Sequence, residues 1–258
     1  MFGFFKRRRR RAVRARPFPL PWERILTENV FYFRRLSSES QDELRDLIKI
    51  FLDEKRFEGC AGVEIDDEIR VTIAAQACIL LLNRANDVYP YVKVILVYPS
   101  TYVDKRPRRL ASGIVIEGGE SRLGESWHHG TVVLAWDAVL RGAADVDDGH
   151  NLVLHEFAHQ LDSEDGAADG APLLGRRTAY GPWARVLGAA YETLMRESKE
   201  GSPTVIDAYG ATNPAEFFAV VTETFFERPR ALRSRYPDLY EQMRSFYQQD
   251  PAELAPKS

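Results

Sequence analysis

One short segment constrains this chain more than any other. His155, Glu156 and His159 form the pattern HExxH inside an apolar run from Leu152 to Leu161. Residues four apart on a helix lie on one face, so both imidazoles can hold the same zinc ion. Glu156, next to the first histidine, is placed to act as the general base that takes a proton from metal-bound water. The pattern also arises by chance among core histidines, but two of only five histidines at ligand spacing favour a metal site.

A catalytic zinc site needs a third protein ligand, and several carboxylates compete for this role. Asp162 and Asp165 occupy the positions where a related pattern has a glycine and a third histidine, which leaves Asp165 a weak candidate. Downstream, the sequence Asn213–Pro214 predicts the start of a helix that carries Glu216 and Glu223 on one face. Glu216 can instead complete a capping box, and Glu223 can instead face solvent. Spacing favours Glu216 without deciding between the two glutamates.

The other histidines are not expected to bind the metal. His128 and His129 fit an exposed loop better than a substrate-binding role, and His150 is five residues from His155 and faces elsewhere on a helix. A carboxylate, either Asp162 or Glu223, can orient a ligand histidine from behind, or can lie on the surface.

Two blocks of the sequence together resemble a known family. They are residues 155–162, HEFAHQLD, and residues 206–220, IDAYGATNPAEFFAV. Both closely resemble the Mlc titration factor A family of bacterial zinc peptidases, and the resemblance extends from residue 20 to residue 251. It implies a catalytic domain related to the protease domain of anthrax lethal factor, which has a gluzincin fold.

The resemblance also implies roles for individual residues. Matched position by position, His155, His159 and Glu216 are the zinc ligands, and Glu156 is the general base. Tyr209 matches a tyrosine near the metal, which implies a hydrogen bond to the developing oxyanion. Without the resemblance, Tyr209 is better explained as an ordinary packing residue.

The remaining periodicities predict an α+β fold with a small mixed sheet, the HExxH helix and a helical C-terminal part. Strand 131–136 is expected to be an edge strand along the substrate cleft. Helices are expected at about residues 40–56 (after a capping box that begins at Ser40), 67–84, 183–199 and 229–250, and strands at 91–98, 114–117 and 131–136.

The N-terminus differs in composition from the rest. Residues 1–16 contain one lysine and seven arginines, so the remainder carries a formal net charge of −11, compared with −3 for the whole chain. We predict a disordered, solubilising tail over residues 1–19, a zinc metallopeptidase domain over 20–251 and a frayed C-terminus over 252–258. Two other readings of the tail stay open, contact with an anionic membrane surface and a nucleic-acid arm.

Composition predicts a soluble protein of the cytoplasm. The hydrophobic fraction of 45% and the charged fraction of 28% are typical of globular proteins. Two cysteines, Cys60 and Cys78, suit a reducing compartment. Prolines rather than an apolar core follow the basic segment, so an ordinary signal peptide is not expected. The apolar run Val71–Leu82 is shorter than the roughly 20 residues that a membrane span requires.

These observations predict a zinc metallopeptidase with one Zn²⁺ per chain and a peptide substrate. The resemblance further implies aminopeptidase activity and a regulatory role through binding of the glucose-transport repressor Mlc or a similar regulator. One alternative is a binding protein that sequesters a transcription factor and has a subordinate or inactive zinc site. The other is a membrane-surface protease recruited through residues 1–16. Specific nucleic-acid binding is not expected.

Overall fold

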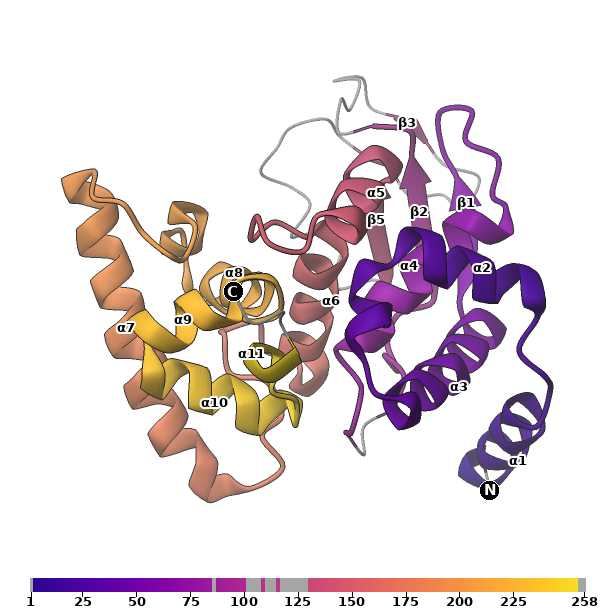
Figure 1. Ribbon diagram of the computed structural model, residues 1–258, viewed down its shortest axis with the longest axis horizontal. Coiled ribbons are helices and arrows are strands. Elements are labelled where there is room, and N and C mark those ends of the chain that lie inside the picture. Colours follow the sequence, from indigo (N-terminus) through magenta and orange to yellow (C-terminus); the bar gives the residue numbers. More distant parts are fainter. Residues whose placement is uncertain (1, 85–86, 101–107, 110–114, 117–129, 255–258) are drawn as a thin grey trace.

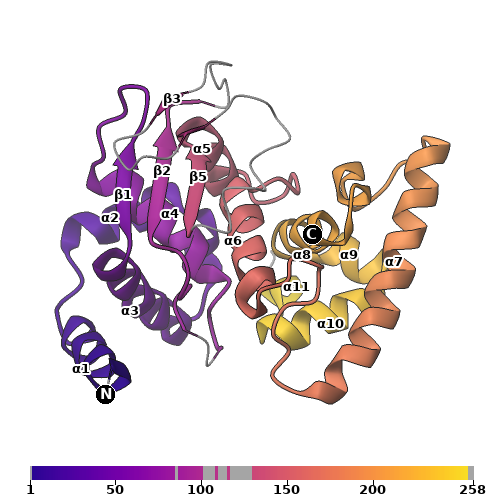
Figure 2. The same cartoon turned by 180° about the vertical axis from the view of Figure 1, so that it is seen from behind.

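Two groups of helices flank a central helix, α6 (Leu152–Asp162), in a computed structural model of the chain (Figure 1). The structure describes residues 2–84, 87–100, 108–109, 115–116 and 130–254. The N-terminal group lies with the sheet on one side of α6, and the C-terminal group lies on the other (Figures 1 and 2). Helix α6, which carries the HExxH pattern, is therefore at the junction of the two halves.

The N-terminal half contains α1 (Phe2–Arg14), α2 (Leu20–Asn29), the 3-10 helix η1 (Phe31–Arg35), α3 (Ser38–Glu54), β1 (Arg56–Gly59), α4 (Asp67–Ile79), β2 (Val94–Tyr98), β3 (Arg108–Arg109), β4 (Val115–Ile116), β5 (Thr131–Ala135) and α5 (Trp136–Ala144). The C-terminal half contains the 3-10 helices η3 (Ser163–Asp165), η4 (Arg177–Ala179) and η5 (Ala208–Ala211), and the helices α7 (Tyr180–Glu200), α8 (Pro214–Glu227), α9 (Pro229–Arg235), α10 (Pro237–Tyr247) and α11 (Pro251–Leu254).

Strands β1, β2 and β5 form a parallel sheet in that order. Ile95 of β2 pairs in register with Phe57 of β1 and Val132 of β5. Helix α4 connects β1 to β2 and returns the chain to the same end of the sheet, which makes the two strands parallel. The expectation of a mixed sheet is wrong for these strands, because the antiparallel pair β3–β4 is separate. As predicted, β5 is an edge strand among the described residues.

Most predicted helices are present, with shifted ends. Helix α3 begins earlier than expected, because Ser37 rather than Ser40 is the N-cap and its side chain accepts a hydrogen bond from the Ser40 backbone N–H. Helix α4 ends at Ile79 instead of residue 84. The single helix expected over residues 229–250 is broken at Tyr236 into α9 and α10, because Pro237 starts a new helix.

The arginine-rich N-terminus is a helix rather than the predicted disordered tail. Helix α1 lies against α3, where Arg10 forms two hydrogen bonds to Glu54 at 2.6 and 2.8 Å. Lys49 of α3 donates a hydrogen bond to the carbonyl of Arg14 at 2.5 Å, which caps the C-terminal end of α1. The segment is ordered by partners about 40 residues away in sequence, which its own composition does not reveal.

At the other end of the chain, helix α11 extends to Leu254, and Pro251 and Ala252 are buried. The predicted fraying over 252–258 is therefore wrong for residues 252–254, and residues 255–258 lie outside the described part of the chain. The predicted domain limits at residues 20 and 251 stay predictions. Within the described ranges, no helix is long and apolar enough to cross a membrane.

Helices α6 and α8 are packed against each other and anchored on opposite sides by aromatic rings. On the N-terminal side, the ring of Phe157 lies 4.7 Å from Tyr89 and 5.7 Å from Phe51, measured between centroids. On the C-terminal side, Phe218 of α8 lies 5.9 Å from Trp183 of α7. Buried aromatic contacts of this kind restrict sliding and rotation of both helices, so the polar side chains between them have defined positions.

The loop after α6 is tied to the start of α8. Asp162 is fully buried, and its Oδ2 accepts a hydrogen bond from the Gly170 N–H at 2.9 Å. Gly170 has a φ of +78°, and a Cβ there would lie 2.5 Å from the carbonyl oxygen of Pro214. Glycine is needed here because both the backbone conformation and the contact with α8 exclude a side chain.

We expect Gly170→Ala to lower the free energy of unfolding by about 2 kcal/mol or more, because alanine disfavours this φ and its methyl group would push on Pro214. Gly188→Ala is the matched control, since Gly188 lies inside α7 with open space where a Cβ would lie, and this change should stabilise the protein by about 0.5 to 1 kcal/mol. Urea denaturation of both variants measures the difference. Equal effects of the two changes would contradict the proposed constraint.

Candidate metal centre

Three donor atoms from α6 and α8 meet between the two helices. The Nε2 atoms of His155 and His159 are 3.2 Å apart. The Oε2 atom of Glu216 lies 3.1 Å from Nε2 of His155 and 3.3 Å from Nε2 of His159. Among the described residues, these three side chains form a group that could hold a metal ion. The structure thus brings together the two histidines of the HExxH pattern and the favoured one of the two glutamates.

The size of this triangle fits a zinc ion. Donor atoms bound to tetrahedral zinc at about 2.0 to 2.1 Å lie about 3.3 to 3.4 Å from one another, close to the three distances observed. Two imidazole nitrogens and a carboxylate oxygen at such separations all present lone pairs, and they repel unless a proton or a cation lies among them. The donor set, two nitrogens and one oxygen, is also common for catalytic zinc.

Local sequence explains how each helix presents its candidate ligands. Asn151 caps α6 by accepting a hydrogen bond from the Leu154 N–H at 3.0 Å, which places His155 in the first turn. Asn213 caps α8 in the same way through the Glu216 N–H at 2.9 Å. The Glu216 carboxylate contacts the histidines, so the capping-box alternative does not describe its side chain.

Glu223 holds His155 from the other side. Its Oε1 lies 2.7 Å from Nδ1 of His155, and its Oε2 accepts a hydrogen bond from the Asn151 backbone N–H at 2.5 Å. An imidazole that donates through Nδ1 has its free lone pair on Nε2, the atom that faces Glu216. Glu223 is buried in α8 and is not on the solvated face that was one of its two predicted settings.

The carboxylates around the two histidines favour a positive charge at this site. Burial opposes the charged form of His155, but hydrogen bonds to Glu216 and Glu223 outweigh it and raise the pKa of His155 to about 10. Burial also opposes ionisation of Glu216, yet its contacts with both histidines lower its pKa to about 2. His159 is buried, and its pKa is lowered to about 4, which leaves a neutral imidazole able to bind a metal.

Glu156 lies beside these three donor side chains in a different environment. Its carboxyl is buried, and burial raises its pKa to about 7, against the attraction of His155 and with added repulsion from Glu216 and Glu223. A carboxyl group with a pKa near neutrality can accept a proton and return it at the same pH. This environment suits the role that the sequence predicts for Glu156.

Tyr209 lies at the exposed side of the site. The residue is 54% exposed, and the centroid of its ring is 6.1 Å from that of the His155 ring. The carboxylate of Asp207 accepts a hydrogen bond from the Tyr209 backbone N–H at 2.7 Å and so holds the turn of η5. Burial and the charges of Glu216 and Glu156 raise the pKa of Tyr209, so its hydroxyl keeps a proton to donate.

The structure places the other candidate residues outside the donor group. Asp165 accepts a hydrogen bond from the Ala167 N–H in the loop after α6, and Asp162 closes that loop instead of contacting a histidine. His150 is exposed, with Nε2 3.8 Å from a carboxylate oxygen of Asp207. The loop histidines at positions 128 and 129 lie outside the described residues.

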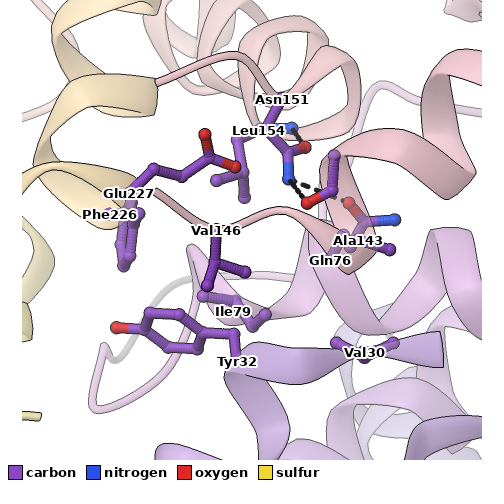
Figure 3. A pocket seen from close by; sticks show the side chains of 11 residues that line it. Val30, Tyr32, Gln76, Ile79, Ala143, Val146, Asn151, Leu154, Phe226 and Glu227 are labelled. Atoms are coloured by element: carbon purple, nitrogen blue, oxygen red, sulfur yellow. Dashed lines mark hydrogen bonds between the residues drawn. The ribbon is translucent and has the colours of Figure 1, made fainter. Parts of the chain in front are cut away.

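A buried polar cluster behind the site was not predicted. Asn151 donates two hydrogen bonds from its side chain, to Gln76 at 3.0 Å and to the carbonyl of Gly142 at 2.9 Å (Figure 3). The cap position of Asn151, just before an apolar helical run, was the available signal for this residue. Glu227 points into the same small cavity, which also adjoins Tyr32. No sequence pattern distinguishes Glu227 from an exposed residue at the end of a helix.

Comparison with known proteins relates the chain to a peptidase family over nearly its whole length. The profile of the family described as glucose-regulated metallo-peptidase M90 matches residues 4–248. Mlc titration factor A of Cronobacter sakazakii is 35% identical over 241 residues, which cover 90% of this chain and 87% of that protein. Mlc titration factor A of Escherichia fergusonii is 34% identical over 245 residues, which cover 92% of this chain and 89% of that protein. An uncharacterized protein of Synechocystis, slr2042, is 42% identical over 247 residues, which cover 94% of this chain and 89% of that protein.

We expect Glu223→Gln to weaken the binding of Zn²⁺ by roughly 10-fold to 100-fold, because an uncharged amide no longer stabilises the Nδ1 proton of His155. Competition with a chelator of known affinity measures the change. Glu192→Gln on the exposed side of α7 removes the same charge and should leave the affinity unchanged. An unaltered affinity in the Glu223 variant would show that His155 does not depend on this carboxylate.

Glu227 should make stability depend on pH. Burial raises its pKa to about 9; Asn151 opposes the shift, and the charges of Asp148 and Glu223 add to it. The pKa of Glu227 in the folded protein exceeds its unfolded value of about 4.5. The protonated carboxyl therefore contributes its full stabilisation of the fold below pH 4.5, and this contribution is lost as the pH rises towards 9. Glu227→Gln should therefore stabilise the protein at pH 8, by roughly a few kcal/mol, and much less at pH 5. Urea denaturation at both pH values measures this, and an equal effect at both would contradict a buried neutral carboxyl.

Proposed function

The chain belongs to the glucose-regulated metallo-peptidase M90 family, and we propose that it is a zinc-dependent peptidase that binds the metal through His155, His159 and Glu216. The observation that carries this proposal is the triangle of donor atoms 3.1 to 3.3 Å apart, with the buried carboxyl of Glu156 next to it in sequence. Three protein ligands would leave a bound zinc ion accessible to water or substrate, as catalytic zinc requires.

The metal would supply Lewis-acid chemistry here, lowering the pKa of a water molecule and polarising the peptide carbonyl. Glu156 accepts the proton of the attacking water and then delivers it to the nitrogen of the leaving amine. Its pKa of about 7 suits both steps, because the carboxyl can exist in either form near neutral pH. Glu223 keeps His155 oriented throughout through the 2.7 Å contact with Nδ1.

Tyr209 is the proposed donor to the developing oxyanion. Its phenol is partly exposed beside His155, where a substrate carbonyl can reach it, and its raised pKa keeps the hydroxyl protonated. A donor aimed at charge that develops in the transition state lowers the barrier to peptide hydrolysis. The site therefore combines a base, a metal-binding group and a hydrogen-bond donor on three neighbouring elements, α6, α8 and η5.

We extend the proposal to an aminopeptidase that also binds a regulator. The aminopeptidase mode is supported by the sequence resemblance and means that substrates carry a free α-amino group. The regulatory role is supported by the name of the relatives, Mlc titration factor A, which associates those proteins with Mlc. An Mlc-like repressor is therefore the proposed partner, and the peptidase site is the proposed source of catalytic activity.

We expect Glu156→Gln to keep its zinc and to lose peptidase activity by at least a hundredfold, because the amide cannot take the proton. Glu216→Ala should lose the metal itself, because only two ligands remain. Zinc content and turnover of peptides with free and blocked N-termini measure both effects, with Glu192→Gln as the charge-matched control. Cleavage of blocked peptides at the same rate would exclude the aminopeptidase mode.

The same variants separate the alternatives. Retained hydrolysis in Glu156→Gln would overturn the proposed chemistry, and unchanged zinc content in Glu216→Ala would favour Glu223 or Asp165 as the ligand. Regulator binding should survive in Glu156→Gln, because the change is buried and isosteric. A wild-type protein that binds the regulator and zinc but cleaves no peptide would support the alternative of a binding protein with an inactive site.

A further inference from the structure

Helix α1 uses one face to attach to the rest of the protein. Residues 6, 9, 10 and 13 follow the spacing of a single helical stripe. Val13 is 2% exposed, and the charged members of the stripe contact acidic side chains of α3 and of the segment before β2. The ion pairs are Lys6 with Asp87 at 2.6 Å, Arg9 with Asp53 at 2.7 Å and Arg10 with Glu54 at 2.6 Å, and Arg10 also contacts Asp87. Three cations and three carboxylates therefore balance each other on this face.

The opposite face of α1 is cationic and aromatic. At 100° per residue, Phe4, Arg8 and Arg11 lie across the helix from the attached stripe, with Arg7 beside them. All three arginines are exposed, and none has an acidic partner within 4.0 Å among the residues that the structure describes. Phe4 is 69% exposed and Phe5 61% exposed, and their rings contact each other at 6.0 Å between centroids. We call Phe4, Arg7, Arg8 and Arg11, with Phe5, the free face.

The position of α1 leaves this face accessible. In both views α1 forms an outer corner of the molecule, at the opposite end of its long axis from α7 (Figures 1 and 2). The metal centre lies between α6 and α8, near the middle. A flat partner can therefore meet the projecting corner without covering the peptidase site.

We propose that the free face of α1 docks the protein onto a membrane surface that contains anionic lipids. Arginines at such a surface gain roughly 1 kcal/mol each from the negative headgroups, and adjacent phenylalanines gain by entering the interface. The helix is already folded and held by its ion pairs, so docking requires little further ordering. A nucleic-acid duplex would satisfy the arginines but leave the exposed pair of phenylalanines in water, which favours lipid as the partner.

The first test is sedimentation with vesicles of phosphatidylcholine alone or mixed with phosphatidylglycerol. Full-length protein should bind the anionic vesicles more strongly, and raised salt should weaken the binding. The triple change Arg7→Gln, Arg8→Gln and Arg11→Gln should reduce binding roughly a hundredfold. Its control carries the same loss of charge at exposed arginines far from α1, namely Arg176→Gln, Arg177→Gln and Arg185→Gln, and should bind as wild type does.

A second variant separates lipid from nucleic acid. Phe4→Ser with Phe5→Ser should weaken vesicle binding, because the rings no longer enter the interface, and should leave peptidase activity and the attached face of α1 unchanged. Equal binding to neutral and anionic vesicles, or full binding by the triple arginine variant, would overturn the proposal. So would tight binding to a DNA duplex that depends on the three arginines and is indifferent to the phenylalanines, combined with no vesicle binding.

Discussion

The two hydrogen bonds of the Glu223 carboxylate are the interaction on which the arrangement of the site depends. One oxygen faces Nδ1 of His155, and the other accepts from the backbone of Asn151, at the N-terminus of α6. A buried carboxylate is stable only with such donors, so it fixes how α8 is rotated against α6. Glu216 lies seven residues earlier on the same face of α8, and this rotation sets it against the Nε2 atoms of both histidines.

Neighbouring glutamates have different pKa values because their immediate surroundings differ. Glu216 contacts two imidazoles and has a pKa of about 2, whereas Glu156 is buried and has a pKa of about 7. A metal ligand must be ionised, and a general base must exchange a proton near the working pH, so each environment suits one role. Glu227, farther back, is kept neutral by burial at a pKa of about 9. Position in the fold, not residue type, distinguishes these three acids.

Sequence reasoning located elements whose signals are local and missed those that depend on distant partners. The cap at Asn213 and the start of α8 at Pro214 were predicted correctly, because the cap and the first turn are adjacent in sequence. Helix α1 was missed, because its order depends on acidic residues of α3 such as Glu54, 44 positions from Arg10. Strand β1 was also missed, since it is four residues long and has no apolar alternation that sequence could detect.

The sequence by itself determined that His155 and His159 share a face of one helix, with Glu156 beside them, because this follows from the helical repeat alone. It also placed Glu216 and Glu223 on one face of a second helix. Only the tertiary structure decided which of those glutamates lies against the Nε2 atoms of both histidines, since both are compatible with the spacing. The packing of α8 on α6 brings Glu216 to Nε2 and Glu223 to Nδ1 of the same imidazole, and no local pattern encodes that relative placement of two helices.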